Sequence, residues 1–128
     1  MADALVDTSV WIEAFRGRDQ RLRETVDKLL DQERVVLCGL VELELLQGFR
    51  ADERALFASL FEALPYAEVD RQDWRAAGFL QAGLRSRGIT IPATDALIAA
   101  LCLRHDLSIL TLDKHFDQIP QLRQFKFT

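Results

Sequence analysis

The sequence predicts an α/β fold, a three-layer α/β/α sandwich built on a mostly parallel sheet. Short apolar runs of strand length alternate along the chain with longer segments whose apolar residues recur at helical spacing. This β-α-β alternation is typical of a parallel sheet covered by helices on both faces. The composition, with 49% hydrophobic and 28% charged residues among 128, is that of one globular domain. We therefore expect residues 1–128 to form a single domain.

The first half of the chain opens with three apolar residues, Ala4–Val6, that predict a short buried strand. Thr8 and Ser9 are common N-cap residues, so a helix is expected to start directly after this strand. The elements expected next are a surface helix at 19–30, a strand at 35–38, and helices at 39–48 and 51–64.

The second half of the chain repeats the alternation. Pro65 is expected to end one helix and Gly88 another, because proline cannot continue a helix and glycine favours its C-terminus. The elements expected are a strand at 66–70, helices at 71–87 and from 93 onwards, a strand at 108–111, a short helix at 114–119 and a last edge strand at 124–127.

Charge and cysteine content limit the kinds of function. The net charge is -4, so binding to nucleic acid would have to depend on local arginines or bound cations. Cys38 and Cys102 lie in apolar segments without metal-ligand spacing, and we expect both to be buried, reduced thiols. No apolar run reaches the ~18 residues of a membrane span, and the N-terminal segment lacks the pattern of a signal peptide. A cytoplasmic protein without membrane contact is expected.

Aspartates follow two of the predicted strands, Asp7 after the first and Asp113 after the fourth. If these strands are neighbours at the point where the strand order reverses, both carboxylates line one crevice. Each aspartate could instead serve only to cap the helix that follows it. The residues alone leave both interpretations open.

Glu44 lies in a segment, 39–49, that is apolar almost all round the helix. Such a helix is expected to be buried, where an unpaired carboxylate is costly. Glu42 and Glu44 point about 200° apart, so only one of them can face a common site. Gly48, one turn further on, leaves room beside Glu44 and favours it. The alternative is that both glutamates lie on a partly exposed rim.

Asp95 opens another largely apolar helix, where the N-terminal N–H groups stabilise a carboxylate and capping is the simplest explanation. However, Asp7, Glu44, Asp95 and Asp113 all lie at or within apolar elements. Together they would repel one another and take up protons unless a cation neutralised them. Oxygen ligands without paired Cys or His suit Mg²⁺ or Mn²⁺, and such ions support the hydrolysis of phosphodiesters.

Three segments, "LVDTSVWIEAF", "ELLQGF" and "IPATDALIAALCLRHDLSILTLDKHF", resemble the PIN-domain endoribonucleases, specifically the VapC toxins of bacterial type II toxin-antitoxin pairs. They span most of the chain in the family's order. The resemblance implies a parallel five-stranded sheet flanked by helices, RNA as substrate, and Mg²⁺ or Mn²⁺ as the catalytic ion. The acidic positions of the family fall on Asp7, Glu44, Asp95 and Asp113, and the "ELLQG" match selects Glu44 over Glu42.

The resemblance also implies supporting residues, because hydroxyls that follow the first aspartate often support the site in such proteins, which makes Thr8 and Ser9 candidates. Thr111 is a candidate from its place at the strand end, and Asp117 because it lies one helical turn beyond Asp113. Some relatives carry a second acid two residues after the position of Asp113, where this chain has His115. The occupancy of a second metal site is therefore left open.

Partners follow from the resemblance as well. The family implies a homodimer and a cognate VapB-type antitoxin, whose C-terminal segment wraps the toxin and obstructs the acidic pocket. The amphipathic helix at 51–64 is a candidate groove wall, although core packing explains its apolar residues equally well. Candidate phosphate contacts, each equally explained as a solvated charge, are Arg16, Arg85, Arg87 and Lys114.

Other families that hold Mg²⁺ with carboxylates fit less well. A response-regulator receiver domain needs an adjacent acidic pair after the first strand and a lysine after the last core strand, but "VDTS" has one acid and Lys114 follows Asp113. A haloacid-dehalogenase-type phosphatase needs an acid at the position of Ser9. A non-catalytic PIN-fold module for protein binding is expected to have lost at least one of the four acids, and all four are present.

Overall fold

The computed structural model describes residues 3–126, which are built around a parallel sheet. Its strands are β1 (Ala4–Val6), β2 (Val35–Cys38), β3 (Tyr66–Ala67) and β4 (Ser108–Leu110). The strand order is β3-β2-β1-β4, and every pair is parallel. Along the chain, β2 and then β3 are added on one side of β1, and β4 is added on its other side. The strand order therefore reverses between β1 and β4. The strands that precede Asp7 and Asp113 are therefore neighbours, which is the condition for both carboxylates to lie at one site.

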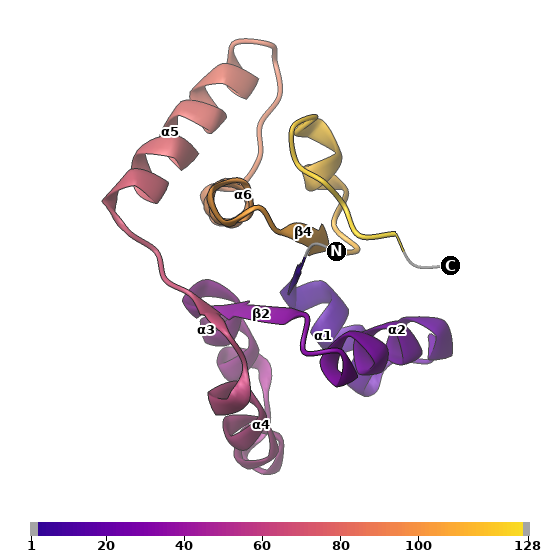
Figure 1. Ribbon diagram of the computed structural model, residues 1–128. Coiled ribbons are helices and arrows are strands. Elements are labelled where there is room, and N and C mark those ends of the chain that lie inside the picture. The colour runs from indigo at the N-terminus through magenta and orange to yellow at the C-terminus, as the bar shows by residue number, and fades with distance from the viewer. Residues whose placement is uncertain (1–2, 127–128) are drawn as a thin grey trace.

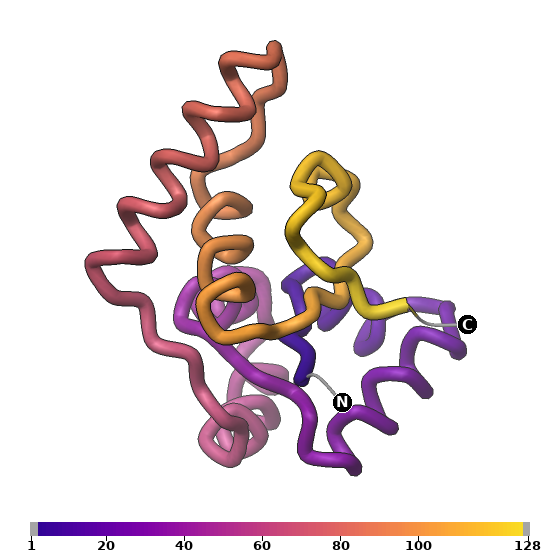
Figure 2. The backbone as a smooth tube through the Cα atoms, turned by 45° about the horizontal axis from the view of Figure 1, so that its top comes forward, coloured from indigo at the N-terminus to yellow at the C-terminus, as the bar shows by residue number. Residues whose placement is uncertain are grey.

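Helices connect the strands and cover both faces of the sheet. They are α1 (Thr8–Arg16), α2 (Gln20–Asp31), α3 (Gly39–Gly48), α4 (Ala51–Ala63), α5 (Arg71–Arg85), α6 (Ala93–His105) and the 3-10 helix η1 (Lys114–Gln118). Figure 1 shows α1 to α4 on one side of β2 and α6 on the other. The tube in Figure 2 shows α5 running alongside α6. The predicted α/β/α sandwich is confirmed.

A cluster of aromatic rings on the α1 side comes from α1, α4 and the residue after α3. It consists of Trp11, Phe15, Phe49, Phe57 and Phe61, of which Phe15 is exposed and the other four are buried in the core. Phe57 stacks on Phe49 with 4.4 Å between ring centroids. Core packing therefore explains Phe57 and Phe61, which are buried, whereas Leu56 on the same helix is exposed.

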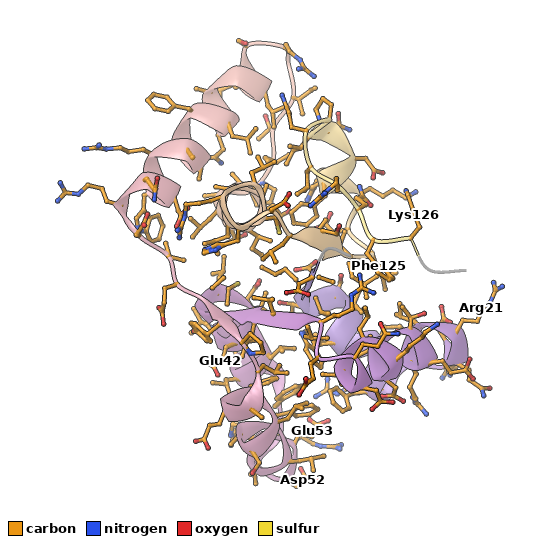
Figure 3. The ribbon with its side chains drawn as sticks, in the orientation of Figure 1. Arg21, Glu42, Asp52, Glu53, Phe125 and Lys126 are labelled. Atoms are coloured by element: carbon orange, nitrogen blue, oxygen red, sulfur yellow. The ribbon has the colours of Figure 1, made fainter. Side chains whose placement is uncertain are left out.

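The edge strand expected at 124–127 is reduced to a single bridge in the part of the chain that is described. The N–H of Ile109 donates to the carbonyl of Arg123 at 2.9 Å, and the carbonyl of Ile109 accepts from the N–H of Phe125 at 2.7 Å, which pairs Ile109 with Gln124. Figure 3 shows Phe125 between β4 and α2. Phe127 lies outside the described residues. The described sheet has four strands rather than five, because the segment meets β4 at one residue only.

Two local expectations are wrong. The strand expected at 66–70 ends at Ala67, because Asp70 caps α5 by accepting a hydrogen bond from the N–H of Gln72 at 2.9 Å. Helix α3 is not buried all round: Leu43 is 54% and Leu46 is 38% exposed. One face of α3 packs on the core and the other faces solvent, although both are apolar.

The two cysteines are buried free thiols, as expected. Burial raises the pKa of both Cys38 and Cys102. Within residues 3–126, no helix has the length and apolar character to cross a membrane.

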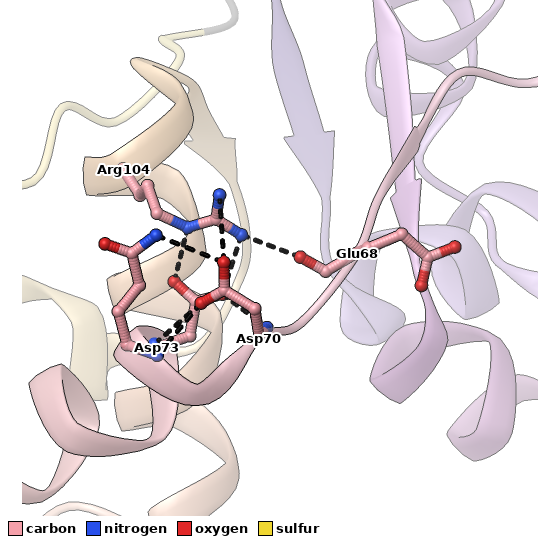
Figure 4. Close-up of polar contacts among 5 residues, drawn as sticks. Glu68, Asp70, Asp73 and Arg104 are labelled. Atoms are coloured by element: carbon pink, nitrogen blue, oxygen red, sulfur yellow. Dashed lines mark hydrogen bonds and ion pairs between the residues drawn. The ribbon is translucent and has the colours of Figure 1, made fainter.

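A buried ion pair joins α5 to α6 (Figure 4). The guanidinium of Arg104 donates two hydrogen bonds of 2.7 Å to the Asp73 carboxylate, whose side chain is 1% exposed. It also donates to the Glu68 carbonyl at 2.8 Å, and Arg104 Nη1 lies 3.7 Å from Asp70 Oδ2. The hydrogen bonds from Arg104 lower the pKa of Asp73. Because the two acids lie at the start of α5 and Arg104 near the end of α6, the ion pair fixes the two helices against each other.

Arg104→Ala is expected to destabilise the protein, because it leaves the buried Asp73 carboxylate without its charged partner. The Tm measured by circular dichroism should fall by at least about 5 °C at neutral pH. The pKa of Asp73 is lowered in the folded state. Its stabilising contribution is therefore present above the usual aspartate range and is lost as the pH falls through the lowered value. The difference in Tm between variant and wild type should shrink in acid.

Arg123→Ala is the matched control for this experiment. Arg123 Nη2 also lies 2.7 Å from a carboxylate oxygen, but that carboxylate belongs to Asp106, whose side chain is 88% exposed. Exposed ion pairs contribute little to stability, so the Tm should change by less than about 2 °C. Equal losses in the two variants would contradict the importance of burial.

Candidate active site

Asp7 lies where β1 ends and α1 begins, and only 6% of the residue is exposed. Its Oδ2 accepts hydrogen bonds from Ser9 Oγ at 3.0 Å and from Thr111 Oγ1 at 2.8 Å. Although Asp7 occupies the N-cap position of α1, its side chain makes no capping hydrogen bond. The capping interpretations of Asp7, Thr8 and Ser9 are therefore wrong, because α1 starts at Thr8 and these side chains bond to one another and to neighbouring elements instead.

Two hydroxyl groups connect Asp7 to the segment that follows β4. Thr111 Oγ1 accepts a hydrogen bond from the Asp113 N–H at 2.9 Å, and Ser9 Oγ accepts one from the Leu112 N–H at 3.1 Å. Each hydroxyl thus accepts from a backbone N–H and donates its own proton to the Asp7 carboxylate. The ends of β1 and β4, and with them Asp7 and Asp113, are held at a fixed spacing.

Glu44 is half-buried on α3 and accepts a hydrogen bond from Thr8 Oγ1 at 3.1 Å. This bond joins it to the residue that directly follows Asp7. Glu42, labelled in Figure 3, lies by Tyr66 instead, and its charge adds to the effect of burial in raising the pKa of Tyr66. The structure thus brings Glu44, and not Glu42, next to the end of β1.

Asp95, Asp113 and His115 form a second group of contacts, contributed by the first turn of α6 and the start of η1. His115 Nδ1 lies 2.8 Å from Asp95 Oδ2 and 3.0 Å from Asp113 Oδ1. One ligand atom from each of the three residues lies within 4.8 Å of the other two. Asp113 also accepts a hydrogen bond from the His115 N–H at 2.9 Å. The capping role of Asp113 is therefore real and coexists with its place in this group.

The proximity of these acids changes their protonation. The pKa of Asp95 is raised to about 6, mainly by burial, and the charges of Asp113 and Asp7 raise it further while the hydrogen bond with His115 opposes the rise. The same hydrogen bond raises the pKa of His115. Thr111 joins the two groups of contacts, because its hydroxyl donates to Asp7 and accepts a hydrogen bond from the N–H of Asp113.

This site has the donors that a divalent cation requires. Asp7, Asp95 and Asp113 present carboxylate oxygens, the ligands that Mg²⁺ and Mn²⁺ prefer, from buried or half-buried positions at the switch point of the sheet. A bound cation would relieve the repulsion that helps raise the pKa of Asp95. The residues present therefore fit such an ion.

Other candidates lie apart from the acids or are bonded elsewhere. Asp117 is exposed and accepts a hydrogen bond from Gln124 Nε2 at 2.6 Å. Arg16 donates to Glu53 at 2.6 Å and to the Gly48 carbonyl at 3.0 Å, and the bond to Arg16 lowers the pKa of Glu53 to about 2. The remaining phosphate candidates, which are exposed and whose contacts stay predictions, are Arg85, Arg87 and Lys114.

His115 is the site residue that sequence reasoning missed. The sequence places it two residues after Asp113, where it counted only as a replacement for an acid. Its contact with Asp95 on α6 depends on how η1 folds back, which no local pattern reveals. The sequence does contain one indication of this role, because histidine is a common metal ligand and this one lies only two residues after Asp113.

Comparison with known proteins identifies the family. Residues 4–122 match the family model of the PIN domain. Over 123 residues the chain is 35% identical to ribonuclease VapC11 of Mycobacterium tuberculosis, with 92% of each chain covered. Over 120 residues it is 30% identical to ribonuclease VapC19 of the same species, covering 93% of this chain and 96% of VapC19.

Solved structures share the fold. The structure of DNA-bound VapBC from Salmonella typhimurium matches with a TM-score of 0.80 at 24% identity, with 98% of both chains covered. VapC20 of Mycobacterium tuberculosis, described as a toxin that cleaves the sarcin-ricin loop, matches with a TM-score of 0.65 at 19% identity, covering 90% of this chain and 93% of VapC20. The receiver and phosphatase alternatives are thereby excluded. The chain belongs to the PIN-domain family, and within it to the VapC ribonucleases.

Proposed function

We propose that residues 1–128 form a single-domain, metal-dependent endoribonuclease that acts as the toxin of a VapBC-type toxin-antitoxin pair. The observation that carries the proposal is the convergence of Asp7, Asp95 and Asp113 at the switch point of the sheet, with Glu44 attached through Thr8. RNA as the substrate is supported by the relatives VapC11 and VapC19, which are ribonucleases.

The proposed chemistry assigns a role to each acid. Asp7, Asp95 and Asp113 would hold Mg²⁺ or Mn²⁺, which when bound lowers the pKa of water and neutralises charge on a phosphate. Ser9 and Thr111 direct their hydroxyl protons at Asp7 and thereby fix its orientation. Glu44 would be a further ligand of the ion or would orient the attacking water. The water oxygen bonds to phosphorus as the P–O bond of the RNA chain breaks, and the leaving oxygen takes up a proton.

A VapB-type antitoxin is the proposed partner. The solved structures from Rickettsia felis and Salmonella typhimurium are VapBC complexes bound to DNA, and both share this fold. An antitoxin segment over the carboxylate site would keep RNA away from it. A cytoplasmic location is proposed with this function, and the two free cysteines agree with a reducing compartment.

A homodimer is the proposed assembly. Leu43, Tyr66 and Trp74 are 54%, 42% and 63% exposed, and they line a cavity of about 290 Å³ between α3 and α5. Large exposed apolar side chains that gather in this way mark protein interfaces. A second copy of the chain would bury this surface.

Asp7→Asn is expected to reduce RNA cleavage at least about 100-fold, because it removes the charge of a proposed metal ligand. The assay incubates the protein, freed of any co-purifying partner, with total cellular RNA and Mg²⁺ or Mn²⁺, and maps new 5′ ends. Asp31→Asn, at an exposed aspartate on α2, is the matched control and should leave the cuts unchanged. EDTA should abolish them.

Cuts that persist in Asp7→Asn or in EDTA would contradict the proposed catalytic site. Loss of the circular dichroism spectrum in Asp7→Asn would indicate a structural role for this residue. If wild-type protein cut no RNA in any sample, the non-catalytic alternative, a PIN-fold module for protein binding, would be favoured.

Millimolar Mg²⁺ is expected to raise the Tm by a few degrees at about pH 7.5, because the ion relieves repulsion among the carboxylates. The pKa of Asp95 is raised to about 6 in the folded state, so its ionisation destabilises the fold as the pH rises through that value. The increase in Tm should therefore shrink below about pH 6, where Asp95 binds a proton instead. Differential scanning calorimetry across this pH range measures it, and an equal shift at every pH would contradict the explanation.

Trp74→Glu is expected to convert the dimer to a monomer, because it places a charge in the proposed interface. Sedimentation should show a mass that falls from twice 14.6 kDa to 14.6 kDa. Leu56→Glu is the control: Leu56 is 67% exposed on α4 and lies outside this surface, so its mass should stay that of the dimer. A wild-type protein that sediments as a monomer would overturn the assembly.

A further inference from the structure

His115 lies between two of the carboxylates that are proposed to hold the ion. Its Nδ1 is 2.8 Å from Asp95 Oδ2 and 3.0 Å from Asp113 Oδ1. Adjacent ligands of a six-coordinate ion with bonds of ~2.1 Å are about 3 Å apart. The two distances from Nδ1 match this spacing, and the three residues together form a group that could hold one ion.

The geometry points to His115 Nδ1 as an additional ligand, which makes this a mixed nitrogen and oxygen site that selects Mn²⁺ over Mg²⁺. The inference rests on the proposed function, since it concerns the same ion. With the ion bound, Nδ1 carries no hydrogen, and the neutral ring keeps its proton on Nε2.

Two features place the ring for this role. The backbone N–H of His115 donates to Asp113 Oδ1 at 2.9 Å, which ties the start of η1 to one of the proposed ligands. The side chain of His115 is 47% exposed while that of Asp95 is 13% exposed, so the imidazole lies on the solvent side of the site. An ion entering from solvent meets the imidazole before it reaches the deeper carboxylate.

A nitrogen ligand changes which ion the site prefers. Carboxylate and water oxygens suit Mg²⁺ and Mn²⁺ alike, whereas imidazole suits transition-metal ions and adds little for Mg²⁺. Replacing the nitrogen should therefore weaken the binding of Mn²⁺ more than that of Mg²⁺. This difference separates a ligand from a residue that only donates a hydrogen bond to Asp95.

Pulsed electron paramagnetic resonance of Mn²⁺ bound to the full chain detects a directly coordinated nitrogen through its nuclear coupling. The wild type should show the coupling of an imidazole ¹⁴N. The chain has two histidines, and the other, His105, lies at the far end of α6, about 15 Å along the helix from Asp95. His105→Asn should keep the coupling. His115→Asn retains an N–H donor close to the place of Nδ1 and should lose the coupling while still binding Mn²⁺ through the acids.

Calorimetric titration with each ion supplies the second readout. His115→Asn should bind Mn²⁺ about tenfold more weakly than the wild type, while its Mg²⁺ affinity changes less than about threefold. Labelling the histidines of the wild-type chain with ¹⁵N should alter the nitrogen coupling without any substitution, which keeps the test independent of how the variant folds.

The outcomes separate this inference from the proposed function. Mn²⁺ that binds the wild type without imidazole coupling, or coupling that survives in His115→Asn, overturns the role of His115 and leaves the carboxylate site intact. Absence of bound Mn²⁺ in the wild type at millimolar concentration overturns both.

Discussion

The parallel pairing of β1 with β4 is the constraint on which the site depends. The register sets Val6 beside Leu110, and the Asp7 N–H donates to the Leu110 carbonyl at 2.9 Å. Asp7 directly follows Val6 and Thr111 directly follows Leu110. Their short side chains are therefore close enough to form a hydrogen bond. The backbone hydrogen bonds between β1 and β4 thus bring Asp7 to Thr111, and the hydroxyl of Thr111 then fixes the orientation of the carboxylate.

The helices supply the other two acids of the site. Helix α3 packs against α1 and brings Glu44 to Thr8, while α6 brings Asp95 to His115. The ion pair of Arg104 with Asp73, near the end of α6 that lies away from Asp95, also holds α6 against α5. The site thus depends on contacts from both helical layers, and its geometry is a property of the whole sandwich.

Much of this could be predicted from the sequence because it follows from local patterns. Strand ends locate Asp7 and Asp113, and a buried apolar helix locates Asp95, as the structure confirms. The other features of the site depend on contacts between side chains that no local pattern predicts. The hydroxyls of Thr8 and Ser9 are of a type that caps helices, but they donate hydrogen bonds to Glu44 and Asp7 instead.

The same limit explains the other differences between expectation and structure. An apolar helix surface predicts burial whether the neighbour is the core or another chain, so α3 was expected to be buried all round while Leu43 is exposed. Apolar spacing likewise does not say how far a terminal segment follows its neighbour, and only Gln124 pairs with β4 among the described residues. The partnership of His115 with Asp95 spans 20 positions and has no periodicity to reveal it.

Ser9 and Thr111 each accept a hydrogen bond from a backbone N–H and donate one to Asp7. The site can therefore form only when β1 and β4 pair in the correct register. A slip of β4 by one residue would turn Thr111 to the opposite face of the sheet and remove both of its hydrogen bonds. A chain that had closed its sheet in the wrong register would therefore also lack an assembled acidic site. In this protein, assembly of the acidic site and correct pairing of β1 with β4 therefore occur together.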